Sequence, residues 1–242
     1  MIAVGSEERL LPAVVVNEAL SERIEKIVAK EARKIGAKER KRLKEEVISE
    51  LLPRAFIRPS RLPAYLDAEA GWLVIDSASR KAAEEAVNQT REALGRFPAV
   101  PMAPEESPRA LMTDWLISGK LPQGWMFGDE CELRDPAEAG AIVRCRRQDL
   151  ESDEVREHLK SGKQVFQLGL EFDGRMAFVL GEDLVVHKLR FLDVVVDELG
   201  EGDAESAHAE LDASFALMTF ELKNLLGHLT EWFGLHRPED RE

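Results

Sequence analysis

Residues 164–191, QVFQLGLEFDGRMAFVLGEDLVVHKLRF, contain the clearest fold signal in the chain. Apolar and polar residues alternate over 164–171, a period typical of a strand with one buried face. Asp173 and Gly174 favour a hairpin turn, so segments 176–180 and 184–191 are predicted to return as antiparallel strands. The C-terminal part of the chain is therefore predicted to contain an antiparallel sheet.

Amphipathic helices are predicted on both sides of this segment. Apolar residues recur at three- and four-residue spacing over 17–35, and a second helix is predicted over 37–52. Asn17 is the expected N-cap of the first helix and Gly36 its expected stop. Further helices are predicted over 79–94, 109–118, 152–160 and 205–233, and further strands over 64–66, 72–76, 125–127 and 141–143.

The grouping of these elements indicates an α+β fold with antiparallel hairpins and long amphipathic helices. Three segments are expected. Residues 1–100 contain a basic helical hairpin, a β-hairpin and a helix. Residues 101–163 form a middle α+β segment that opens with Pro101, Pro104 and Pro108, and residues 164–242 hold antiparallel strands and the long final helix.

Composition excludes several classes of protein. The chain has 242 residues with 33 Lys and Arg against 46 Asp and Glu, a net charge of −13. A uniformly basic nucleic-acid binder is therefore excluded, although a local basic surface is not. Two cysteines exclude a disulfide-rich scaffold and a four-cysteine zinc site. No apolar segment approaches the roughly 20 residues of a spanning helix, and no signal peptide is visible, so a cytoplasmic protein without membrane contact is expected.

Charge is distributed unevenly along the chain. Residues 21–44 hold ten bases and four acids, a net charge of +6, whereas residues 192–212 hold eight acids and no Lys or Arg. This asymmetry suggests a positive face for a polyanion. A solvated helix face that binds nothing is the alternative. The candidate residues for binding a polyanion in this part are Lys30, Arg33, Lys34, Lys38, Arg40, Lys41 and Arg42.

Two smaller basic clusters follow. Arg144, Arg146 and Arg147 lie close to Gln148 at the end of a predicted strand, and guanidinium groups suit phosphate contacts. Lys188 and Arg190 form a third patch on another predicted strand. The sequence leaves open whether these patches converge in space.

Catalytic signatures are missing: there is no glycine-rich phosphate loop, no His-Glu-x-x-His and no Gly-x-Ser-x-Gly. A non-enzymatic protein without cofactor or metal is therefore expected. A metal-dependent nuclease stays as an alternative, because Glu221-Leu222-Lys223 and Glu39-Arg40-Lys41 match a Glu-x-Lys nuclease fragment. The acids Asp193, Asp197, Glu198 and Glu201 could also bind a cation, although a solvated acidic loop is favoured there.

Motifs along nearly the whole chain resemble the recombination-associated RdgC family. The matching segments, in order, are LLP at 10–12, EARK at 31–34, LKEEV at 43–47, LLPRAF at 51–56, GWLVIDSAS at 71–79, FPAVP at 97–101, RCRRQDL at 144–150, KLRF at 188–191 and DASFALMT at 212–219. No single segment is a signature of chemistry, but their collinear order is specific.

The resemblance implies a nucleoid-associated protein that binds double-stranded DNA without sequence preference and opposes RecA-dependent recombination. It also implies an elongated, horseshoe-shaped subunit and a ring of two subunits around the duplex. By this resemblance Arg33, Lys34, Lys38, Arg40, Lys41 and Arg147 would face the DNA. Arg33, Lys34 and Arg147 match family positions, while Lys38 and Lys41 lie in a looser register. Phe56, beside Arg54, matches an aromatic residue at the subunit contact; an ordinary core residue is the alternative for Phe56.

One departure concerns the start of the chain. Family members usually carry additional residues before the segment that opens this sequence, so an open sheet edge is expected and ring closure has less support than DNA binding. A protein-interaction module acting through the acidic residues 192–212 is a further alternative. Whether single-stranded DNA also binds is left open.

Overall fold

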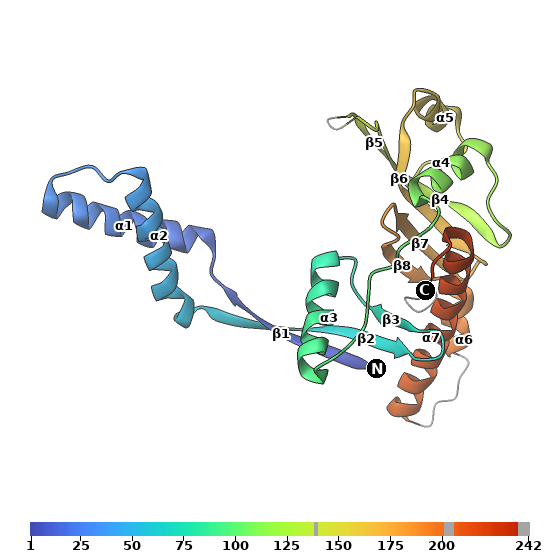
Figure 1. Cartoon of the computed structure of the whole chain (residues 1–242), viewed down its shortest axis with the longest axis horizontal. Helices are drawn as coiled ribbons and strands as arrows, with labels where there is room; N and C mark the ends of the chain where they lie inside the picture. The colour runs from blue at the N-terminus through green and yellow to red at the C-terminus, as the bar shows by residue number, and fades with distance from the viewer. Residues whose placement is uncertain (138–139, 201–205, 237–242) are drawn as a thin grey trace. The chain divides into compact units, whose positions relative to one another are not determined.

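The computed structural model describes residues 1–137, 140–200 and 206–236. The chain divides into two compact units (Figure 1). Unit 1 comprises Met1–Asp67 and Trp72–Phe97, and unit 2 comprises Ala68–Gly71 and Pro98–Glu242. Both units combine helices with antiparallel strands, so the α+β class predicted from sequence is confirmed.

Unit 1 is built on a three-stranded antiparallel sheet of order β1-β2-β3. Strand β1 (Ile2–Leu10) pairs with β2 (Phe56–Asp67) along its whole length, and β3 (Trp72–Ile75) pairs only with the last part of β2. Pro59 and Pro63 therefore lie where β2 has one full partner strand, so their missing N–H groups cost no ladder bond. Helix α3 (Arg80–Leu94) follows β3 as predicted, and the Ser79 side chain caps it by accepting a hydrogen bond from the Ala82 N–H.

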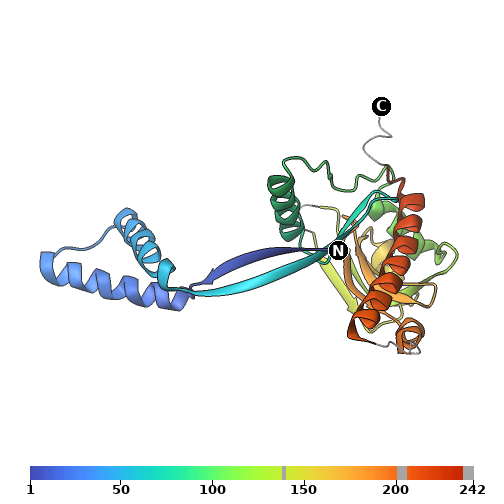
Figure 2. The ribbon, with the colours of Figure 1, turned by 90° about the horizontal axis from the view of Figure 1, so that it is seen from below.

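A helical pair is inserted between β1 and β2, at the end of the ribbon where Leu10 pairs with Phe56 (Figure 2). It consists of α1 (Ala13–Glu31) and α2 (Ala37–Leu51), followed by the short η1 (Leu52–Arg54). Only Val16 and Leu20 of α1 and Leu43 and Val47 of α2 are buried. This narrow apolar seam leaves most of both helices in solvent.

Several predicted boundaries in unit 1 are wrong. Helix α1 begins at Ala13 rather than at Asn17, and it ends before Ala32, which takes the left-handed conformation at φ 49°. Gly36 is extended and precedes α2 instead of stopping α1. Strand β2 starts at Phe56 rather than at residue 64, since its prolines disguise the strand pattern.

Unit 2 contains a five-stranded antiparallel sheet of order β5-β4-β6-β7-β8. Its strands are β4 (Trp125–Arg134), β5 (Ile142–Arg146), β6 (Gln164–Phe172), β7 (Met176–Gly181) and β8 (Val186–Phe191). The predicted turn at Asp173 and Gly174 joins β6 to β7 and is confirmed. Strands β4 and β5 are longer than predicted, and β8 begins two residues late because Leu184 forms a buried turn at φ 61°.

One face of this sheet packs against α4 (Pro108–Ser118) and α7 (Ala207–Phe233). Trp125 on β4 meets Trp232 of α7 at a ring separation of 4.4 Å and Trp115 of α4 at 6.4 Å. Large aromatic side chains contribute most to such a core. The other face, which carries Gly169, Ala177 and their cross-strand neighbours, is called the open face below.

The remaining helices of unit 2 are α5 (Asp153–Lys160), as predicted, and α6 (Asp193–Gly200). Helix α6 corrects the prediction of an acidic loop at this place, because Val195 is buried and anchors the segment as a helix. Ser206 caps α7, and residues 201–205 lie outside the described part of the chain. Among the described residues, no helix has the length and apolar character needed to cross a bilayer.

Candidate nucleic-acid interface

The helical pair of unit 1 carries the first predicted basic cluster. Three of the ten bases in residues 21–44 form ion pairs: Arg23 with Glu50, Arg33 with Glu31 and Glu39, and Arg42 with Glu46. The other seven are exposed and form no ion pair within the described residues. These seven free cations are Lys26, Lys30, Lys34, Lys38, Arg40, Lys41 and Lys44. Their charge is available to an external polyanion.

Arg33 has a different environment from its neighbours. Its Nε donates to Glu31 at 2.6 Å, and its two terminal nitrogens donate to Glu39 at 2.7 Å each. The hydrogen bonds that Arg33 donates to Glu39 lower the pKa of Glu39, and those that it donates to Glu39 and Glu31 raise the pKa of Arg33. Arg33 therefore ties the α1–α2 connection to α2, and two carboxylates balance its charge.

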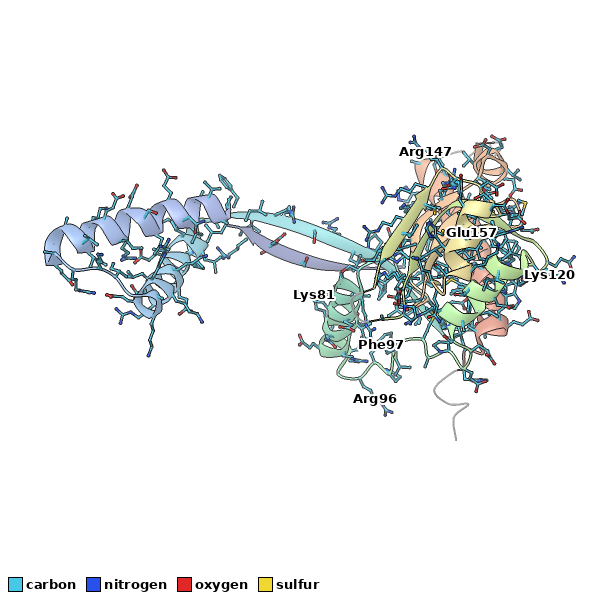
Figure 3. The ribbon with its side chains drawn as sticks, turned by 90° about the horizontal axis from the view of Figure 1, so that it is seen from above. Lys81, Arg96, Phe97, Lys120, Arg147 and Glu157 are labelled. Carbon is cyan, nitrogen blue, oxygen red and sulfur yellow. The ribbon has the colours of Figure 1, made fainter. Side chains whose placement is uncertain are left out.

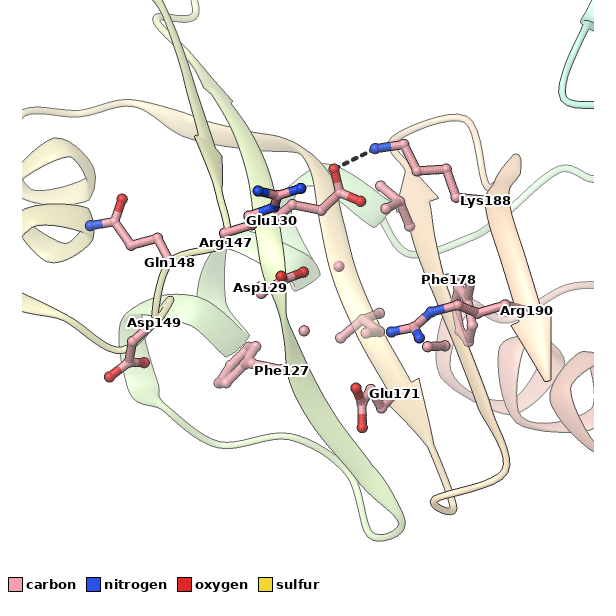
Figure 4. A pocket seen from close by; sticks show the side chains of 15 residues that line it. Phe127, Asp129, Glu130, Arg147, Gln148, Asp149, Glu171, Phe178, Lys188 and Arg190 are labelled. Atoms are coloured by element: carbon pink, nitrogen blue, oxygen red, sulfur yellow. Dashed lines mark hydrogen bonds and ion pairs between the residues drawn. The ribbon is translucent and has the colours of Figure 1, made fainter. Parts of the chain in front are cut away.

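The second and third basic clusters meet on the open face of unit 2. Arg147 and Gln148, which follow β5, line the same trough as Lys188 and Arg190 of β8 (Figure 4). The trough has a volume of about 780 Å³ and is floored by small residues such as Gly169, Ala177 and Val179. The fold therefore brings together two patches that are more than 35 residues apart in sequence.

A bulge in β4 shapes the trough. Gly128, Asp129 and Glu130 lie opposite the single residue Gly169 of β6. A Cβ at position 169 would come within 2.8 Å of the Glu130 carbonyl oxygen, and one at position 128 within 3.0 Å of the Gly169 backbone. Only glycines permit this close approach of two backbones.

Two cationic residues of the trough have unusual backbone conformations. Arg147 has φ 54° and Lys188 has φ 53°, in the left-handed region that few non-glycine residues adopt. At β8, Lys188 and Leu189 together face Phe178 across the ladder, so the strand bulges. Outliers of this kind often cluster at functional sites.

The arginines of β5 differ in their partners. Arg144 donates to Glu132 at 2.5 Å, and Arg134 donates to the same carboxylate. Burial alone would raise the pKa of Glu132, but the hydrogen bonds from Arg144 and Arg134 hold it below the usual range. Arg146 pairs across the ladder with Glu130 by register, but it forms no ion pair with any described residue.

The trough lining carries slightly more negative than positive charge. Lys188 bonds to Glu130 at 2.5 Å, and Gln148 donates to Glu154 at 2.6 Å. Arg147 and Arg190 make no ion pair within the described chain. The carboxylates of Asp129, Glu130, Asp149 and Glu171 outnumber the three cations of the lining by one.

Phe56 is not a core residue of this chain. Its side chain is 84% exposed at the start of β2, and its ladder partner Leu10 and its neighbour Ile57 are also exposed. Arg54, in η1, is exposed as well. An apolar patch of this kind at the base of the helical pair is typical of a protein contact surface.

The carboxylates that suggested a nuclease are engaged elsewhere. Glu221 is 1% exposed and accepts from Arg175, which also binds Glu198 through two hydrogen bonds. Glu39 belongs to the Arg33 cluster. Among the described residues, no group of three or more His, Cys, Asp or Glu side chains could hold a metal ion; Glu201 lies outside them.

Sequence reasoning missed Glu130 and Gly169. The sequence contains many acidic residues, so Glu130 does not stand out. Its contact with Lys188 depends on the bulge in β4, which no local sequence pattern predicts. Gly169 interrupts an apolar strand, which is a weak sign of a bulge or a close approach.

Comparison with known proteins identifies the family. The sequence model described as "RdgC: Putative exonuclease, RdgC" matches residues 1–236. The chain is 45% identical over 238 residues to the "Recombination-associated protein RdgC" of Xanthomonas campestris pv. campestris (strain B100), covering 98% of this chain and 79% of that protein. It is 47% identical over 224 residues to the protein of the same name from Xanthomonas axonopodis pv. citri (strain 306), covering 93% and 74%.

A third relative of that name, from Stenotrophomonas maltophilia (strain R551-3), is 44% identical over 238 residues, which cover 98% of this chain and 79% of the relative. These matches define a class of recombination-associated proteins. The chain belongs to the RdgC family, so the family resemblance stated from the sequence is confirmed.

Proposed function

We propose that the chain binds double-stranded DNA without sequence preference and modulates RecA-dependent recombination without cleaving the DNA. It acts in the cytoplasm on the nucleoid, as a homodimer. The observation that carries this proposal is the set of seven free cations on the helical pair. Phosphates are the ligand that such exposed, unpaired side chains recognise, and they carry no sequence information.

The distribution of charge reconciles this proposal with an acidic protein. The whole chain has a net charge of −13, yet residues 21–44 are positive. On α2, Lys38, Lys41 and Lys44 recur every three residues and so lie along one side of the helix. A local basic face attracts the DNA backbone while the acidic remainder repels it, which restricts binding to that face.

The test is a charge reversal with a matched control. Lys38→Glu, Arg40→Glu and Lys41→Glu together remove three free cations of the helical pair. Lys81→Glu, Arg96→Glu and Lys120→Glu make the same change of charge at exposed positions outside the helical pair and the trough (Figure 3). Binding of both triple variants to two unrelated duplexes is measured over a salt series.

The first triple variant is expected to weaken binding to both duplexes alike. Its slope of log affinity against log salt should fall by about 2.7, since each neutralised phosphate contributes about 0.9. The control triple should keep the wild-type slope. Equal losses in the two triple variants would refute the helical pair as the binding surface.

A metal-dependent nuclease is the second candidate, because the description of the matching family model names an exonuclease. Its test is loss of end-labelled duplex with excess protein in the presence of magnesium. We expect intact DNA after long incubation, because Arg175 and Arg33 occupy Glu221 and Glu39. Magnesium-dependent shortening would overturn the non-enzymatic part of the proposal.

An interaction module is the third candidate. Asp193, Asp197 and the exposed Val194 of α6 offer a mixed acidic and apolar surface. Pull-down of RecA without DNA, repeated with Asp193→Asn and Asp197→Asn, separates direct contact from competition for DNA. Capture of RecA that these substitutions abolish would favour the interaction module.

A further inference from the structure

An ion pair crosses the trough of unit 2. In the sheet order, β4 and β8 are separated by β6 and β7. Three strand spacings amount to about 14 Å in a flat sheet, yet the Lys188 ammonium on β8 lies 2.5 Å from the Glu130 carboxylate on β4. The two side chains therefore bridge the open face from one side of the trough to the other.

The residues of the trough floor beneath the Lys188–Glu130 ion pair have small side chains or none. A Cβ on Gly169 would lie 3.3 Å from the Glu130 Cγ and 2.8 Å from its carbonyl oxygen. Ala177 and Val179 continue the same face with small side chains. A glycine inside a strand often marks a place where a ligand or another backbone approaches closely.

The carboxylate of Glu130 occupies an anion slot. In Figure 4 it lies between the guanidinium group of Arg147 and the ammonium group of Lys188. Both cations project from left-handed backbone positions, and Arg147 has no ion pair of its own among the described residues. A carboxylate and a phosphate present the same kind of acceptor oxygens to such donors.

We propose that Glu130 is a built-in competitor for a phosphodiester group. When nucleic acid enters the trough, a backbone phosphate replaces the Glu130 carboxylate on Lys188 and gains the neighbouring charges of Arg147 and Arg190. This inference rests on the proposed DNA binding and adds a second contact surface with its own regulation. The trough has more carboxylates than cations. Its affinity for phosphate therefore depends on whether the Glu130 carboxylate leaves Lys188.

The exchange is expected to be readily reversible. The side chain of Lys188 is 60% exposed and that of Glu130 is 24% exposed. Ion pairs at this level of exposure change an equilibrium by only about 1.5- to 5-fold. Glu130 therefore weakens nucleic-acid binding without abolishing it.

The decisive variant is Glu130→Gln, which removes the competing charge and keeps the shape of the side chain. Its matched control is Glu157→Gln on α5, which removes one negative charge from another Glu–Lys ion pair, to Lys160 at 2.8 Å (Figure 3). Binding to a random duplex at low salt is the readout. We expect Glu130→Gln to bind about 3- to 5-fold more tightly than wild type, and Glu157→Gln to change binding less than about twofold.

A second pair of variants tests the partner. Lys188→Gln should reduce the salt slope by about 0.9, because one phosphate contact is lost. In the double variant with Lys188→Gln, Glu130→Gln should no longer tighten binding. A thermal melt of each variant checks that the fold is retained, and Glu130→Ala repeats the test with a side chain that cannot hydrogen-bond to Lys188.

The outcomes separate the competitor role of Glu130 from the proposed DNA binding. If wild type binds duplex and Glu130→Gln behaves like Glu157→Gln, the competitor role is refuted and the proposed function stands. If only Glu130→Gln binds, the competitor role is supported while the proposed function fails for the wild-type chain. If neither binds, both are overturned.

Discussion

The ion-pair cluster around Arg175 is the best place to test the energetics of unit 2. Arg175 follows the β6–β7 turn and donates from Nε to Glu221 of α7 at 2.7 Å and through two nitrogens to Glu198 of α6. The Glu221 side chain is only 1% exposed, whereas that of Glu198 is 45% exposed. Replacing Arg175 by Met retains the apolar stem and leaves the Glu221 carboxylate buried without its partner.

The two acids contribute very different amounts to the expected loss. Stranding a buried charge costs about 3–5 kcal/mol, while an exposed pair such as that of Glu198 is worth about 0–1 kcal/mol. Because Arg175 itself is 23% exposed, the lower part of the first range applies. Arg175→Met should therefore lower the free energy of unfolding at about pH 7.5 by about 3–4 kcal/mol.

Urea unfolding followed by tryptophan fluorescence measures this loss, since Trp125 and Trp232 lie in the core that α7 covers. Arg175→Met with Glu221→Gln should recover at least half of the loss, and Glu198→Gln alone should cost less than about 1 kcal/mol. A loss below about 1 kcal/mol for Arg175→Met, or no recovery on adding Glu221→Gln, would refute the reasoning.

Three further predictions concern other parts of the chain. Gly169→Ala should lower the free energy of unfolding by about 1–3 kcal/mol, because its Cβ would lie 2.8 Å from a backbone oxygen. The control Gly227→Ala, where a Cβ on α7 would meet no other atom, should raise the free energy of unfolding by about 0.5–1 kcal/mol. A lower free energy of unfolding in both variants would contradict this account. Glu132→Gln should destabilise the protein at neutral pH in urea unfolding, and the difference from wild type should vanish as the pH falls below the lowered pKa of Glu132. This direction follows because a carboxyl group with a lowered pKa in the folded state stabilises the fold only at pH values above that pKa, where it is ionised. A difference between variant and wild type that grows as the pH falls would contradict this prediction. Phe56→Ser should shift the proposed homodimer toward monomer in sedimentation equilibrium without changing the Tm of the chain. A dimer fraction equal to that of the wild-type chain would exclude Phe56 from the contact.

The hairpins of unit 2 could be predicted because their signals are local. Alternation over β6 and the Asp173–Gly174 turn depend only on neighbouring residues, and both are confirmed. Strand β2 could not be predicted in full, because Pro59 and Pro63 are allowed only by the absence of β3 along that part of the strand. Whether a strand tolerates proline depends on which strands pair with it, and the local sequence does not show that pairing.

The candidate site also combines features that the local sequence predicts with features that depend on tertiary contacts. The composition of residues 21–44 predicted a basic helical pair, and the structure finds most of its bases exposed and unpaired. Arg33 lies in the same basic stretch, but it forms ion pairs with Glu31 and Glu39, which the composition alone did not predict. The positions of Arg147 and Lys188 on either side of Glu130 follow from bulges and sheet curvature, which depend on the close approach of Gly128 and Gly169.

The most direct test of the central claim is the binding of this 242-residue chain to random-sequence duplexes over a salt series. The proposal predicts a steep linear fall of log affinity with log salt, and the same slope for unrelated sequences. The Lys38, Arg40 and Lys41 reversal should reduce that slope, while the Lys81, Arg96 and Lys120 reversal should not. No binding at low salt, or binding that depends on sequence and not on salt, would contradict the account.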